Sequence, residues 1–207
     1  MISESNFNKL AKQGYNRIPL MCEILADLDT PLSTYTKICN LKYSYLFESV
    51  EGGDKWGRYS IIGLPAKKII SVCGNKITIK ENNKCIEEYN TNDPLAEIEK
   101  IQQSYKVPQI ENMPRFNGGL VGYFGYETIK YIEPKLKKNE KEDPIGSPDI
   151  LLMVSDEVII FDNLSGKLFI IVHAEPEKNN AYINAKKRLN TITEILSSNQ
   201  IKKTHLN

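Results

Sequence analysis

The sequence is poor in the residues that metal sites and nucleophilic catalysis need. Histidine occurs only at positions 173 and 205, and the four cysteines show no C-x-x-C spacing. A zinc site is therefore not expected, and we predict neither a metal ligand nor a catalytic residue in this chain. His173 follows an apolar run typical of a strand and His205 lies near the end of the chain, so neither has a sequence partner for a Ser-His or Cys-His arrangement.

Long apolar runs and an excess of charge of one sign are also missing. No apolar stretch approaches the roughly 18 residues that a transmembrane helix needs, and no apolar N-terminal run precedes a cleavage site. The 27 Lys and Arg residues balance 26 Asp and Glu residues, which leaves a net charge of +1. A chain without a long-range field has no electrostatic attraction to nucleic acid or to an anionic membrane. We expect a cytoplasmic protein with no nucleic-acid partner and no membrane association.

What remains has the composition of a globular protein. The chain has 207 residues, of which 41% are hydrophobic and 26% charged, enough to bury a substantial core. Period-two alternation predicts strands at 17–25, 43–50, 58–64, 67–73, 76–80, 84–89 and 167–173, and one strand or two within 150–161. Capping residues and apolar periodicity predict helices at 4–12, 31–39, 94–105 and 179–198.

These elements predict an α+β fold in which a mostly antiparallel sheet, half of a β-sandwich-like core, is covered by helices. No repeat or low-complexity linker divides the chain, so we expect one domain over residues 1–200 and a polar tail over 201–207. The segment 116–127 has glycines at 119, 122 and 125. Glycine weakens an ordinary strand, so this spacing predicts bulges or a second backbone passing close by. The spacing does not match the dinucleotide fingerprint.

The strands at 43–50 and 58–64 contain the best candidate site. The first is aromatic and apolar until Glu48 and Ser49, and a turn on Gly52 and Gly53 is expected to join it to the second. A carboxylate and a hydroxyl at the end of a buried strand either find partners within the protein or bind a ligand. A solvated strand end with a turn-capping serine stays an equal alternative. Gly52 and Gly53 with Lys55 do not form a phosphate loop, because G-x-x-x-x-G-K-[ST] is absent.

The segments 46–53 and 56–63, read Leu-Phe-Glu-Ser-Val-Glu-Gly-Gly and Trp-Gly-Arg-Tyr-Ser-Ile-Ile-Gly, resemble the N-terminal region of anthranilate synthase component I. The segments 118–127 and 148–158 match the same family further along the chain. The resemblance extends from about Leu20 to Leu196. Aminodeoxychorismate synthase component I is the related family that must be distinguished from it. The equivalent of the Glu-Ser segment in that family differs more from this sequence.

The resemblance implies a role in tryptophan biosynthesis. The full family subunit converts chorismate to anthranilate with Mg2+, using ammonia from a glutamine amidotransferase subunit, component II. Its N-terminal region carries much of the allosteric site at which L-tryptophan acts as feedback inhibitor. By the motif, Glu48 and Ser49 are then ligand-binding residues for L-tryptophan, with Phe47, Tyr59 and Ser60 as walls or backbone contacts.

The family's chorismate-binding and metal-binding motifs lie in a C-terminal half that has no counterpart in this sequence. We therefore expect no cofactor in this chain and no anthranilate synthesis by it alone. Three functions stay open: a tryptophan-sensing module, a scaffold that only docks the amidotransferase subunit, and a fragment whose inhibitor pocket is incomplete without the missing half.

Overall fold

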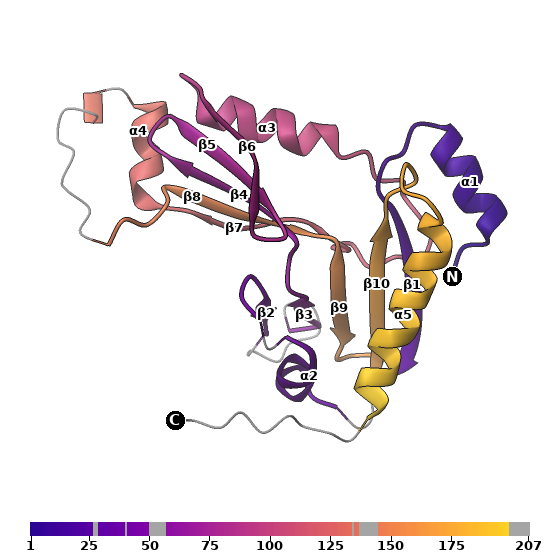
Figure 1. Cartoon of the computed structure of the whole chain (residues 1–207). Helices are drawn as coiled ribbons and strands as arrows, with labels where there is room; N and C mark the ends of the chain where they lie inside the picture. The colour runs from indigo at the N-terminus through magenta and orange to yellow at the C-terminus, as the bar shows by residue number, and fades with distance from the viewer. Residues whose placement is uncertain (27–28, 40, 50–56, 134, 137–144, 199–207) are drawn as a thin grey trace. The chain divides into compact units, whose positions relative to one another are not determined.

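The computed structural model describes residues 1–26, 29–39, 41–49, 57–133, 135–136 and 145–198. These residues form two compact units, each assembled from separated segments of the chain (Figure 1). The first unit comprises Met1–Ala66, Tyr105–Gly118 and Ser155–Asn207, and the second comprises Lys67–Ser104 and Gly119–Val154. The single domain expected over residues 1–200 stays a prediction. The tail at 201–207 and the turn at Gly52 and Gly53 lie outside the described residues.

The first unit contains an antiparallel sheet with the strand order β1-β10-β9-β3-β2. Its strands are β1 (Ile18–Leu25), β2 (Tyr45–Phe47), β3 (Tyr59–Gly63), β9 (Glu157–Asp162) and β10 (Lys167–Ala174). Its helices are α1 (Glu4–Lys12), α2 (Pro31–Ile38) and α5 (Ala181–Ser197). The α+β prediction with antiparallel sheets and covering helices is confirmed.

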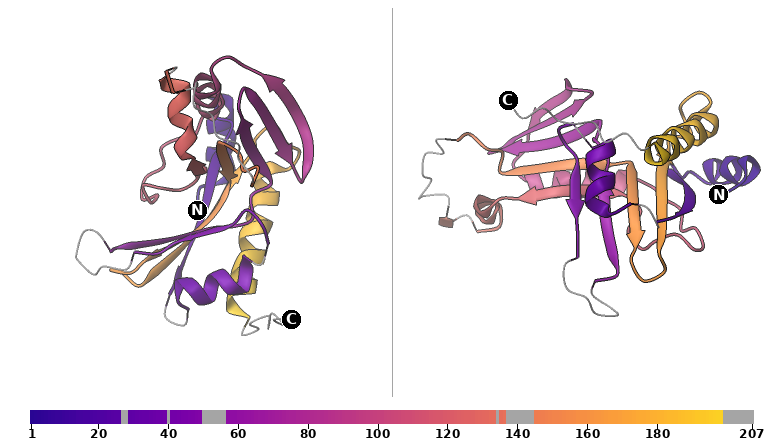
Figure 2. Two further views of the ribbon diagram at one scale, coloured as in Figure 1. Left: turned by 90° about the vertical axis from the view of Figure 1, so that its left-hand side faces the viewer. Right: turned by 90° about the horizontal axis from the view of Figure 1, so that it is seen from below.

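One face of this sheet packs against the three helices. The apolar core on that face joins Ile18, Leu20, Ile62 and Ile170 of the strands to Phe7 of α1 and to Ala185, Leu189, Ile192 and Leu196 of α5. Figure 2 shows α2 lying alongside β2 and β3. The opposite face carries a smaller cluster of Val158, Ile160 and Ile171, against which Met113 and Phe116 pack.

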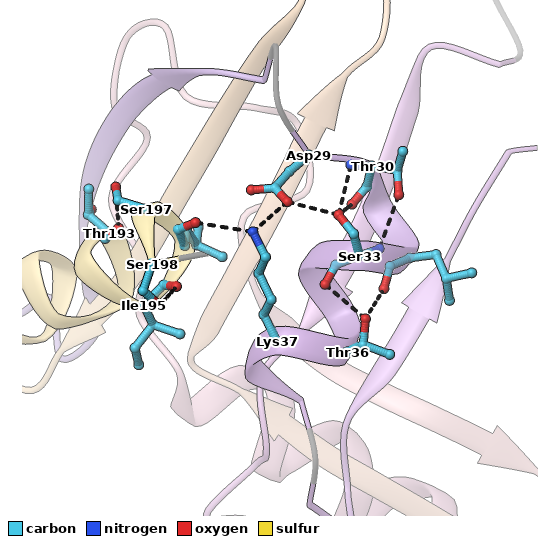
Figure 3. A network of polar contacts seen from close by, with 11 residues as sticks. Asp29, Thr30, Ser33, Thr36, Lys37, Thr193, Ile195, Ser197 and Ser198 are labelled. Carbon is cyan, nitrogen blue, oxygen red and sulfur yellow. Dashed lines mark hydrogen bonds and ion pairs between the residues drawn. The ribbon is translucent and has the colours of Figure 1, made fainter. Parts of the chain in front are cut away.

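Helix α2 begins where the sequence predicts, because residues close in sequence provide the hydrogen bonds at its N-terminus. The Thr30 side chain accepts from the Ser33 backbone N–H, the Ser33 side chain accepts from that of Thr30, and Pro31 takes the first helical position. Lys37 then joins α2 to the end of α5 (Figure 3). Its ammonium donates to Asp29 Oδ1 at 2.7 Å and to the Leu196 carbonyl oxygen at 3.3 Å. A cation suits the last turn of a helix, whose carbonyls have no partners within the helix.

The second unit contains a sheet with the order β6-β5-β4-β8-β7. Its elements are β4 (Lys68–Cys73), β5 (Lys76–Glu81), β6 (Lys84–Asn90), α3 (Pro94–Ser104), β7 (Gly119–Phe124), the 3-10 turn η1 (Tyr126–Thr128), α4 (Ile129–Ile132) and β8 (Ile150–Ser155). The three short strands expected at 67–73, 76–80 and 84–89 are present as β4, β5 and β6, which pair in that order. The segment 150–161 forms two strands, β8 and β9, which belong to different sheets.

The glycine segment behaves as its spacing predicts at Gly122 and Gly125. A Cβ atom at Gly122 would lie 1.9 Å from the Leu151 carbonyl oxygen, and one at Gly125 would lie 3.0 Å from the Asp149 carbonyl oxygen. Both carbonyls belong to the backbone that passes beside β7, so only glycine fits without displacing it. At Gly119 nothing lies within 4 Å, and its φ of +133° is the reason for glycine there.

The expected strand at 43–50 is wrong in its length, because only residues 45–47 form β2. Tyr43 has a φ of +64°, in the left-handed region, and the Ser44 hydroxyl donates to the Leu41 carbonyl oxygen at 3.0 Å. This turn brings the chain to β2 at Tyr45. At its other end β2 stops at Phe47, so Glu48 and Ser49 follow its last residue instead of lying within it.

Candidate functional site

The pairing of β2 with β3 is set by a tyrosine opposite a glycine. Tyr45 pairs with Gly63, Leu46 with Ile62 and Phe47 with Ile61. The Tyr45 ring lies directly over Gly63, since a Cβ atom there would be 1.9 Å from Tyr45 Cε1. Residues paired across antiparallel strands share a face of the sheet. Tyr45 and Phe47 therefore lie on the face that carries Ile61.

Tyr45 is anchored at its far end. Its hydroxyl lies 2.8 Å from the Ser155 hydroxyl, and burial raises the pKa of Tyr45 to about 12. The Phe47 ring packs against the Tyr45 ring, with centroids 4.9 Å apart. Because Tyr45 is fixed at both ends, it positions Phe47, whose side chain is 54% exposed and offers an aromatic surface at the end of β2.

Glu48 and Ser49, the two residues that the motif singles out, come directly after Phe47. Glu48 is exposed and Ser49 is half-buried. A solvent-facing carboxylate one residue beyond an exposed aromatic ring can attract an ammonium group while the ring covers an apolar one.

Tyr59 and Ser60 lie on opposite faces of the sheet. Tyr59 pairs with Asp162 and is 38% exposed, whereas Ser60 is 1% exposed and pairs with Phe161 of the helix-covered core. The Asn163 amide donates to the Ser60 hydroxyl at 3.4 Å. Ser60 was expected to be either a wall of the site or a backbone contact. Because successive side chains of a strand alternate between its faces, the Ser60 side chain points away from the face of Tyr59. On that face only the backbone of Ser60 can contact a ligand.

Arg58 holds the Tyr59 ring in place. Its guanidinium donates to both Asp162 oxygens, at 2.9 and 2.6 Å, and lies 4.9 Å from the centroid of the Tyr59 ring. Hydrogen bonds from Arg58 lower the pKa of Asp162 to about 2. Asp162 is 3% exposed, and its Oδ1 also accepts from the backbone N–H groups of Leu164 and Ser165 in the β9–β10 turn. The Arg58 side chain thus ties the start of β3 to the end of β9.

Next to Tyr59 the sheet face is hollowed. A cavity of about 460 Å³ is lined by Tyr59, Ile61 and Ile160 of β3 and β9 and by Pro114, Arg115 and Phe116 of the segment that packs on this face. The volume lies within the range of small-molecule sites. Sequence reasoning missed the last three residues, because the segment around Pro114 is irregular and carries no periodic pattern. Phe47 is paired with Ile61, one of the cavity walls.

His173 has a structural partner instead of a catalytic one. Its Nε2 lies 2.7 Å from the Asn117 carbonyl oxygen, and burial lowers the pKa of the imidazole to about 4. Within the described ranges, no three His, Cys, Asp or Glu side chains gather in a way that could hold a metal ion. In that same part of the chain, no helix is long and apolar enough to cross a membrane.

Comparison with known proteins shows the family to which the chain belongs and the proteins to which it is similar. The model of the chorismate binding enzyme family matches residues 45–206, and the chain belongs to this family. It is 49% identical over 195 residues to anthranilate synthase component 1 of Pseudomonas putida and 49% identical over 195 residues to that of Neisseria meningitidis serogroup C. The relative from Acetivibrio thermocellus is 40% identical over 193 residues. The resemblance to anthranilate synthase component I is confirmed.

The chain spans only part of these proteins. The Pseudomonas alignment covers 94% of this chain but 40% of the relative, and the Acetivibrio alignment covers 92% and 38%. The crystal structure of anthranilate synthase component I from Streptococcus pneumoniae TIGR4 has the same fold over 86% of this chain and 37% of that chain, with a TM-score of 0.54 and 24% identity.

Proposed function

We propose that this chain is the regulatory portion of an anthranilate synthase component I and carries part of the binding site for L-tryptophan. The observation that supports this most directly is the 49% identity to anthranilate synthase component 1 over 94% of the chain. The segment that resembles the family's inhibitor-binding motif includes Phe47, Glu48 and Ser49. In the complete protein, this site would regulate the conversion of chorismate to anthranilate, a reaction that takes ammonia from component II and uses Mg2+.

The chemistry of a free amino acid suits the end of β2. The exposed Glu48 carboxylate is a partner for the ammonium group, and the rings of Phe47 and Tyr59 are surfaces on which an indole stacks. Ser49 supplies a hydroxyl and a backbone N–H for polar contacts with the ligand. Ser60 contributes through its backbone alone.

Calorimetric titration of L-tryptophan into the chain tests the proposal. We expect a Kd in the micromolar range, about −8 kcal/mol, and no measurable heat with the Glu48→Ala and Ser49→Ala variants. Glu177→Ala is the matched control, because Glu177 is an exposed carboxylate in the turn before α5. A wild-type chain that is folded by circular dichroism yet gives no heat with L-tryptophan would contradict the proposal.

A second function, docking of the amidotransferase subunit, is favoured by the surface of the second unit. The end of β7 and the helical turns after it expose large apolar side chains, with Phe124 54%, Tyr126 90% and Ile132 63% exposed. Exposed apolar residues gathered on neighbouring elements mark protein-binding surfaces. Co-purification with component II, compared between the wild type and Tyr126→Ser, tests this function. We expect the substitution to weaken retention without changing tryptophan binding.

A further inference from the structure

Arg115 stands apart from the other arginines of the chain. The four arginines are Arg17, Arg58, Arg115 and Arg188. Arg17 pairs with Asp156 and Glu175, Arg58 with Asp162, and Arg188 with Glu157. Among the residues that the structure describes, Arg115 has no carboxylate partner, and it lines the cavity beside β3. A guanidinium has a planar set of donors that matches a carboxylate with two parallel hydrogen bonds.

The other walls of the cavity are apolar and aromatic. Tyr59, Ile61 and Ile160 point from the same face of the sheet, because Tyr59 and Ile61 are two residues apart on β3 and Ile160 pairs with Ile61. Phe116 packs against this face and adds a second ring. A lining with two rings and two isoleucines suits a flat aromatic group, for which offset or edge-to-face packing is favourable.

The Tyr59 wall is held in a fixed position. Arg58 stacks on its ring and is tied to the buried Asp162 by two hydrogen bonds. A wall that is ordered before the ligand arrives loses less conformational freedom on binding. The cavity therefore combines a cation that has no carboxylate partner among the described residues, a preorganised ring and a volume of about 460 Å³.

From this arrangement we propose that the cavity binds an aromatic carboxylate, with its ring against Tyr59 and Phe116 and its carboxylate on Arg115. This inference rests on the proposed function and deepens it: Arg115 takes the carboxylate of the effector, whereas Glu48 takes its ammonium group. The link is spatial, because Ile61 of the cavity pairs with Phe47, which immediately precedes Glu48.

Three ligands separate the two charges of the effector. L-tryptophan carries both, indole-3-propionate keeps the carboxylate without the ammonium, and tryptamine keeps the ammonium without the carboxylate. In calorimetric titrations, Arg115→Met should raise the Kd for L-tryptophan and for indole-3-propionate by at least about tenfold. The Kd for tryptamine should change by less than about twofold. Arg115→Lys should recover part of the loss, because it restores the charge but not the two parallel donors.

Further variants act as controls. Phe116→Ala should weaken the binding of all three ligands, because each carries the indole ring that is expected to pack against Phe116. Lys12→Met removes one exposed cation from α1 and should change none of them. Circular dichroism verifies that every variant is folded. Equal weakening of tryptamine and indole-3-propionate by Arg115→Met would overturn the inference, since it would show a loss of structure instead of a lost charge pair.

The two proposals fail in different ways. If L-tryptophan binds, is lost in Glu48→Ala and is unaffected by Arg115→Met, the inference is wrong and the proposed function stands. If indole-3-propionate binds through Arg115 while L-tryptophan does not bind, the inference stands and the proposed function is wrong. A folded wild-type chain that binds none of the three ligands overturns the inference as well.

Discussion

Replacing Gly63 by alanine tests the contact that sets the pairing of β2 with β3. The added Cβ atom would lie 1.9 Å from Tyr45 Cε1. Carbon atoms in contact need about 3.5 Å, so the ring must move by about 1.5 Å. The ring is not free to move, because its hydroxyl is 2.8 Å from that of Ser155 and Phe47 packs against it. Overpacking costs about 1–3 kcal/mol and a buried hydroxyl without its partner about 1–3 kcal/mol, so we expect a loss of about 2–6 kcal/mol.

Urea unfolding of Gly63→Ala, followed by circular dichroism, measures this loss. A double-mutant cycle with Tyr45→Val identifies its cause, because valine suits a strand and removes the ring that the new methyl group would meet. Adding Gly63→Ala to Tyr45→Val should then cost less than about 1 kcal/mol. Ser155→Ala measures the part of the stability loss that comes from the hydrogen bond between Tyr45 and Ser155. An equal cost of Gly63→Ala in both backgrounds would refute the reasoning, as would a loss below about 1 kcal/mol in the wild type.

Three further substitutions test other contacts. Gly122→Ala should destabilise the second unit by about 1–3 kcal/mol or more, because its Cβ would be 1.9 Å from the Leu151 carbonyl oxygen; unchanged hydrogen exchange of the β7 and β8 amides would contradict this. Lys37→Met should cost about 1–3 kcal/mol in urea unfolding, against less than about 0.5 kcal/mol for the exposed Lys178→Met. Burial lowers the pKa of His173 from 6.5 to about 4 in the folded chain. As the pH is lowered from 6.5 to about 4, the unfolded chain takes up the His173 proton before the folded chain does, so the free energy of unfolding should decrease over this range. His173→Gln should flatten that part of the pH profile; a profile unchanged by it would refute the assignment.

Local signals in the sequence predict most of the helices and turns. Ser3 accepts from the Asn6 backbone N–H and Asp93 from that of Ala96, so the starts of α1 and α3 depend on residues three positions apart. The β9–β10 turn is equally local, with Gly166 at a φ of +63°. Patterns of this range are visible without knowledge of the fold.

The candidate site was predictable only in part. The motif identified Glu48 and Ser49, and the alternation of β3 explains why Tyr59 and Ser60 have separate surroundings. The late start of β2 was not predictable, because propensity alone gives no sign that Tyr43 adopts a left-handed conformation. The position of Arg115 beside Tyr59 was not predictable either, since nothing in the irregular segment around it indicates which strand it faces.

By itself, the sequence determined the family resemblance, the alternation of the strands, the helix caps and the position of the Glu-Ser pair, because each depends on residues close together in the chain. The tertiary structure decided which distant segments became neighbours. The order β1-β10-β9-β3-β2 brings strands from both ends of the chain into one sheet, and packing on that sheet puts residues 114–116 beside Tyr59. It also pairs three arginines with carboxylates and leaves Arg115 without a partner among the described residues. Contacts of this kind depend on the burial and charge of residues far apart in sequence, which no local pattern encodes.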